Sequence, residues 1–136
     1  MPNWCENTLE VWGDEKELKE FVEKTIKEND MENGDNFHMG ELLPIPKDKE
    51  DDWYNWNVTN YGTKWDDMSI SYSAYGDGDL TVDFMSAWAP PSEFIENIYK
   101  KFPNLHFKLR YDEPGMAFFG ITKAGDGACT DNCQNY

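Results

Sequence analysis

The sequence predicts a single α+β domain in which strands and helices follow a split β-α-β order. Its 136 residues suit one domain built around one core. Two stretches carry apolar residues at helical spacing, and five others alternate apolar and polar residues as strands do. In chain order these elements read β-α-β-β-α-β, followed by one added strand that forms a C-terminal hairpin. A long aromatic-rich insertion, residues 30–67, follows the first helix.

The first strand and the first helix are predicted from residues 7–29. Leu9 and Val11 alternate with polar neighbours over residues 7–13, which is typical of a strand with one buried face. Asp14 then occupies an N-cap position, with Glu17 three residues later as its capping-box partner. Apolar residues at helical spacing continue to about residue 29, where a polar run rich in Asn and Gly ends the helix.

The second half of the chain predicts a hairpin, a helix and two further strands. Alternation over residues 68–86 is interrupted by the turn sequence Gly-Asp-Gly-Asp at 76–79, which indicates a β-hairpin. Pro90 and Pro91 open a helix, because the first turn of a helix does not use its N–H groups and proline lacks one. Pro103 ends the helix, because an interior position needs that N–H. Residues 105–111 and 116–122 alternate again as strands. We predict a domain over residues 1–124 and a loose C-terminal tail over residues 125–136, where no periodicity is present.

Four motifs in this order resemble a known family. They are MPNWCENTLEVWG at the start, NYGTKWD in the insertion, FMSAWAPP before the second helix and YDEPGMAFFG near the end. Together they look like the YubB-type ferredoxin-like family of plasmid and phage proteins, and the resemblance spans the chain to about residue 120. The sequence departs from the family pattern at Tyr61, where the family has Trp, and at Ala89, where it has Ser. The resemblance implies a ferredoxin-like fold and an origin in a mobile genetic element, without a known reaction.

Charge and composition limit the classes of partner. Twelve basic and 27 acidic residues give a formal charge of −15, which is the wrong sign for binding the phosphates of duplex nucleic acid. No apolar run is long enough to cross a membrane, and the N-terminal stretch lacks the basic and apolar regions of a secretion signal. Three cysteines, an odd number, favour free thiols in a reducing compartment. We therefore expect a cytoplasmic protein of the host cell.

The aromatic stretch WYNWNVTNYGTKWDD, residues 53–67, predicts the binding site. A segment that only fills a core would carry aliphatic side chains instead of indoles and amides, which need hydrogen-bond partners. Indoles could stack on a planar ligand while amides, a lysine and a carboxylate bind its edges. The predicted ligand-binding residues are Asn3, Trp4, Trp56, Asn60, Tyr61, Lys64, Trp65, Asp66 and Trp88. The alternative is that these tryptophans form a small core that fixes the insertion to the sheet.

The insertion is also the only segment large and apolar enough to cover the second face of the sheet. Both predicted helices should pack on one face, and the other face would then be open to water. We expect the insertion to fold back onto this open face and to leave a hollow there.

Catalytic and metal-binding arrangements are poorly supported. Cys5, Cys129 and Cys133 with a histidine could supply zinc ligands, but the spacing of the last two does not match a zinc knuckle. A catalytic thiol needs a neighbouring base, and His38 and His106 are the only histidines. Phosphate-binding loops and nucleophile motifs are missing. We assign no catalytic residue, metal ligand or cofactor.

Two function classes follow, and an enzyme is the third and least favoured. The first is a non-enzymatic binding protein of a phage or plasmid that sequesters a small planar or nucleotide-like ligand, plausibly as a counter-defence protein. The second is an acidic protein-interaction inhibitor, or decoy, that blocks a basic host protein. A homo-oligomer is compatible with both.

Overall fold

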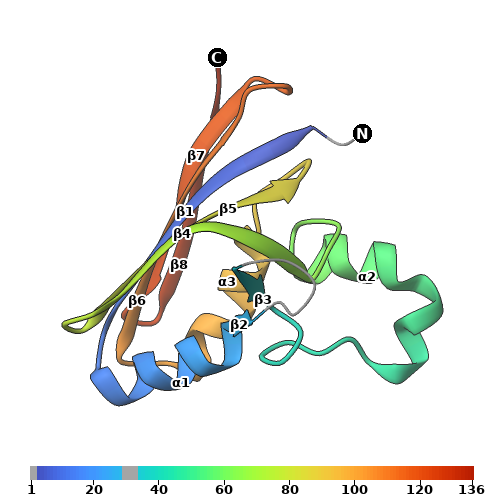
Figure 1. Ribbon diagram of the computed structural model, residues 1–136. Coiled ribbons are helices and arrows are strands. Elements are labelled where there is room, and N and C mark those ends of the chain that lie inside the picture. The colour runs from blue at the N-terminus through green and yellow to red at the C-terminus, as the bar shows by residue number, and fades with distance from the viewer. Residues whose placement is uncertain (1–2, 29–33) are drawn as a thin grey trace.

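The structure, a computed structural model, describes residues 3–28 and 34–136 and contains one large antiparallel sheet (Figure 1). The strands run in the spatial order β2-β3-β4-β5-β1-β6-β7-β8. Their bounds are β1 Trp4–Gly13, β2 Ile26–Glu28, β3 Asp35–His38, β4 Asp67–Gly76, β5 Asp79–Ala87, β6 Leu105–Glu113, β7 Phe118–Gly125 and β8 Ala128–Asn135. The four central strands β4-β5-β1-β6, with the helices between them, form the predicted split β-α-β unit, so the α+β prediction is confirmed.

Three α-helices lie on the same side of this sheet (Figure 1). They are α1 Glu15–Thr25, α2 Trp53–Asn60 and α3 Ser92–Ile98, and two 3-10 helices, η1 Lys47–Asp52 and η2 Tyr99–Lys101, precede α2 and follow α3. The predicted cap of the first helix is confirmed, since the Asp14 carboxylate accepts a hydrogen bond of 3.0 Å from the Glu17 N–H. Among the described helices, none has the length and apolar character needed to cross a membrane.

Alternation along the central strand β1 gives the sheet one covered face and one open face. Leu9 and Val11 point toward the helices and are fully buried, whereas Trp4 and Trp12 point away from them and are 42% and 40% exposed. Phe21 of α1 and Phe107 of β6 meet on the covered side with their ring centroids 5.5 Å apart. The core therefore lies between the sheet and its helices, and the opposite surface is the open face.

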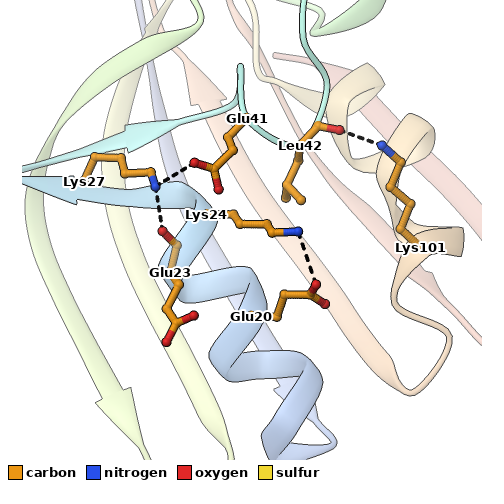
Figure 2. Close-up of polar contacts among 7 residues, drawn as sticks. All are labelled: Glu20, Glu23, Lys24, Lys27, Glu41, Leu42 and Lys101. Atoms are coloured by element: carbon orange, nitrogen blue, oxygen red, sulfur yellow. Dashed lines mark hydrogen bonds and ion pairs between the residues drawn. The ribbon is translucent and has the colours of Figure 1, made fainter.

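The described part of the insertion extends the sheet as β3 and then runs mostly along the covered side, so the prediction that the insertion folds over the open face is wrong for most of the described length. Figure 2 shows two of its attachments, Lys27 to Glu41 at 3.0 Å and Lys101 to the Leu42 carbonyl at 2.6 Å. Tyr61 packs against Phe94 of α3, with ring centroids 6.1 Å apart. Buried apolar side chains such as Phe94 lie on the helix side of the sheet, so the insertion finds its packing partners there. The end of the insertion, around Trp65, reaches the open face.

Two differences from the predicted strands concern the sheet edges. Residues 128–135 form β8, which pairs with β7 over its whole length, so the predicted loose tail is wrong there. The two-residue turn between them, Asp126 and Gly127, has positive φ values of 53° and 80°, which suit a hairpin. At the other edge, the predicted first helix ends at Thr25, and β2 and β3 add two short strands next to β4. The predicted helix end near residue 29 is therefore wrong, because residues 26–28 pair with β3 as a strand.

Removing one hydroxyl should weaken the attachment of the insertion. The Tyr61 hydroxyl donates a hydrogen bond of 2.6 Å to the Leu43 carbonyl, and the Tyr61 side chain is almost fully buried. Tyr61→Phe should therefore lower the free energy of unfolding by about 1 kcal/mol, because the partly buried Leu43 carbonyl loses its donor. Urea unfolding measures this change. Tyr54→Phe, at an exposed position of α2, is the matched control, and equal effects of both substitutions would contradict the packing described here.

Candidate functional site

Three distant segments converge at one end of the sheet. β1 and β5 are antiparallel, so Trp4 at the start of β1 lies opposite Ala87 at the end of β5. The Trp88 N–H donates to the Asn3 carbonyl at 2.8 Å. The last part of the insertion joins them, because the Thr63 hydroxyl donates to the Ala87 carbonyl at 2.8 Å. The predicted site residues Asn3, Trp4, Lys64, Trp65 and Trp88 are thus brought to the same end of the sheet.

Trp4 and Trp65 form the wall of a hollow on the open face, which we call the Trp hollow. Their ring centroids are 6.0 Å apart and the rings are tilted by 34°. The hollow has a volume of about 420 Å³. Its lining consists of these two indoles, two apolar strand residues, Met85 of β5, two serines and one carboxylate: Trp4, Trp65, Asp67, Met68, Ser69, Ile70, Ser71 and Met85. A mostly apolar lining with a few polar groups is the usual composition of a small-molecule site.

The turn that presents Trp65 is held by Asn57, a buried residue that sequence analysis did not select. Its side-chain amide donates a hydrogen bond of 2.8 Å to the Lys64 carbonyl. The Lys64 ammonium lies 4.7 Å from the centroid of the Trp65 ring, within the range of a cation–π interaction. Asn57 lies four residues after Trp53 and four before Tyr61, which places the three on one face of a helix, and this spacing was the available sequence signal. An Asn on a buried face needs partners for its amide.

Trp56, Asn60 and Tyr61 lie away from the Trp hollow and attach α2 to the core. The Trp56 and Tyr61 rings meet edge to face, with centroids 5.2 Å apart at 88°. Asn60 donates to the Trp56 carbonyl, and its own carbonyl accepts from Asn97 of α3 at 2.9 Å. Burial raises the pKa of the Tyr61 hydroxyl, so it remains a proton donor to Leu43. The packing in this part of the insertion resembles the alternative prediction, a small tryptophan core that fixes the insertion in place.

Asp66 belongs to a different hollow beneath the insertion. This second hollow, also of about 420 Å³, is lined by His38, Gly40, Glu41, Pro44, Ile45, Trp53, Asn57, Tyr61 and Asp66. The Asp66 carbonyl accepts a hydrogen bond of 2.8 Å from the Met39 N–H, which ties this end of the insertion to its beginning. Six residues that were not predicted line the Trp hollow in its place: Asp67, Met68, Ser69, Ile70, Ser71 and Met85.

The cysteines and histidines do not assemble into a reactive group. Cys5 is fully buried, and its burial raises the pKa of the thiol to about 12. His106 stacks on Trp12 with centroids 5.6 Å apart, and Trp12 is at the opposite end of β1 from Trp4. Within residues 3–28 and 34–136, no group of three or more His, Cys, Asp or Glu side chains is arranged to hold a metal ion.

Comparison with known families agrees with the topology. A family model described as the ferredoxin-like domain in Api92-like protein matches residues 56–135, more than half of the chain. The chain belongs to this family. The ferredoxin-like fold is thereby confirmed, and the matched segment runs from Trp56 in α2 to the end of β8. No curated protein and no solved structure matches the chain.

The environment of the cysteines predicts their order of reaction. At pH 8 iodoacetamide should alkylate the exposed Cys133 and spare Cys5, because a thiol whose pKa is about 12 contains almost no thiolate at that pH. Peptide mass spectrometry after a timed reaction measures the modification of each cysteine. In denaturant all three cysteines should react. Alkylation of Cys5 at the rate of Cys133 in the folded protein would show that the start of β1 opens.

Proposed function

We propose that the protein is a non-enzymatic binding protein that holds a small planar ligand in the Trp hollow. The observation that carries this proposal is the pair Trp4 and Trp65, which come from distant segments and meet around an open hollow. Trp4 remains 42% exposed although it lies on a central strand. Exposed indoles that line a concave surface are typical of ligand recognition by stacking.

The chemistry of the hollow favours stacking as the main source of affinity. A planar ring placed on an indole gains roughly 1–3 kcal/mol per base in single-stranded nucleic-acid complexes. Ser69, Ser71 and Asp67 also line the hollow and supply polar groups that can bind the edge of a ring. A nucleobase has a suitable shape and edge. The phosphates of a nucleotide would find one nearby cation, Lys64, already placed over Trp65.

A second candidate is an acidic protein-interaction inhibitor that blocks a basic protein. Two observations favour it, namely the formal charge of −15 and the sheet face that no helix covers. Such a charge accelerates association with basic partners and repels acidic ones. The phage or plasmid origin implied by the YubB-type resemblance stays a prediction, and so does a role in counter-defence. Both are compatible with either candidate.

Replacing either indole of the Trp hollow should weaken binding without unfolding the protein. With adenosine as the probe, Trp65→Ala and Trp4→Ala should each weaken binding about 5- to 100-fold, the equivalent of one lost stacking partner. Isothermal calorimetry measures binding, and a melting curve should stay within a few degrees of the parent protein.

Trp12→Ala is the matched control, because Trp12 lies on the same strand and face with almost the same exposure. If only Trp12→Ala reduced binding, the ligand would sit at the opposite end of the sheet. A collapse of folding in Trp65→Ala would indicate that Trp65 is part of the core.

Ionic strength separates the two candidates. Over a roughly tenfold increase in salt concentration, adenosine binding by stacking should change little. Binding of a basic probe protein should weaken steeply over the same range, since charge attraction between exposed groups is screened. Fluorescence anisotropy of the labelled basic probe and calorimetry of adenosine give the two salt series. Steep salt dependence of a tight basic complex together with no adenosine binding would favour the inhibitor.

A further inference from the structure

A second depression adjoins the Trp hollow on the open face. It has a volume of about 380 Å³ and shares Ser71 and Met85 with the Trp hollow. Its further outward-facing side chains are Glu6 and Thr8 of β1, Asp83 of β5, and Arg110 and Asp112 of β6. A continuous concave surface therefore extends from Trp65 across β4, β5 and β1 to β6.

Carboxylates dominate this surface. Glu6, Asp67, Asp83 and Asp112 line the two hollows against one cation, Arg110, which leaves a net charge of −3 from four negative and one positive side chain. Among the described residues, none of these four carboxylates forms an ion pair. The charge is therefore free to act on a ligand in the hollow.

Asp83 shows a specific need for a hydrogen-bond donor. Its Oδ1 atom is buried and has no hydrogen-bond partner among the described residues. The Asp83 carbonyl, by contrast, accepts a hydrogen bond of 3.2 Å from the Ser71 hydroxyl. A buried carboxylate oxygen without a donor is unfavourable. Rotation of the Asp83 carboxylate toward a donor that arrives with a ligand in the depression would remove this cost.

Indoles next to carboxylates select one kind of ligand. A planar cation such as a guanidinium or an amidinium can stack on an indole face through its charge and its flat shape. The same group can direct parallel N–H donors at a carboxylate. We propose that the surface formed by the two hollows takes a planar cation, which stacks on Trp4 or Trp65 in the Trp hollow and donates hydrogen bonds to Asp83 in the adjoining depression. This inference rests on the proposed function and adds the charge of its ligand.

Two probes of the same shape test the proposal. Benzamidinium is a planar cation, and benzamide is its neutral counterpart. Titration of the ¹⁵N-labelled protein, followed through the indole N–H signals of Trp4 and Trp65, detects even millimolar binding. Benzamidinium should bind about tenfold more tightly than benzamide, and its affinity should fall as salt is added. Equal affinity of the two probes would overturn the inference.

Substitution of the carboxylate assigns the contact. Asp83→Asn should weaken benzamidinium binding about three- to tenfold and leave benzamide binding unchanged, since only the cation loses its charged partner. Asp48→Asn is the matched control, because Asp48 is an exposed carboxylate of η1. Equal weakening by Asp48→Asn, or no effect of Asp83→Asn, would overturn the assignment to Asp83.

The outcomes also separate this inference from the proposed function. If benzamide binds as well as benzamidinium and both depend on Trp65, the planar-ligand site stands and the charge inference fails. If neither probe shifts the Trp4 and Trp65 signals, the proposed function fails with it.

A pair of peptides identifies the source of the cation. An arginine-containing tripeptide that binds more tightly than benzamidinium, and more tightly than its neutral citrulline counterpart, would point to an arginine side chain of a partner protein. Weaker binding of the arginine peptide than of benzamidinium would point to a free small molecule, and both results support a planar cation.

Discussion

The alternation of side chains along β1 is the constraint on which the rest of the structure depends. β1 pairs with β5 on one side and β6 on the other, which fixes the face of the sheet that each β1 side chain points to. Asn7 fixes this arrangement from the buried face, where its amide donates to the Cys5 carbonyl and to the Ser86 hydroxyl at 2.8 Å. A shift of one residue would bury Trp4 and Glu6 and expose Leu9. The open face is therefore a consequence of the same register that builds the core.

Much of the fold could be predicted from the sequence because its signals are local. The cap at Asp14, the hairpin turn at 76–79 and the prolines before α3 each specify their own geometry. The β7–β8 hairpin carried the same kind of signal, since Asp77 and Asp126 each precede a glycine and have φ values of 54° and 53°. Sequence analysis used the first turn and overlooked the second, because β8 is polar and shows no apolar alternation. Its strand depends on pairing with β7, which is a long-range interaction.

The candidate site was less predictable for a related reason. The sequence shows that indoles and amides are concentrated in the insertion, and it does not show which face of the sheet each one meets. Trp56 and Tyr61 pack next to α3, whereas Trp65, four residues after Tyr61, reaches the open face. Met85 lines the same hollow as Trp65 because β5 pairs with β4, the strand that follows the insertion. Which residues become neighbours in this way depends on the order in which the strands pair. That order can be predicted from a sequence only when every strand has been identified.

The strong negative charge and the exposed aromatic face explain one another. Large side chains on the open face remain at least 40% exposed, namely Trp4, Trp12, Tyr72, Met85, Phe119 and Tyr136. A sheet face of this kind would favour association between copies of the chain. A formal charge of −15 opposes such association by mutual repulsion between molecules. The same charge would draw cations toward the indoles, so the proposed planar cation is compatible with a surface that repels its own copies.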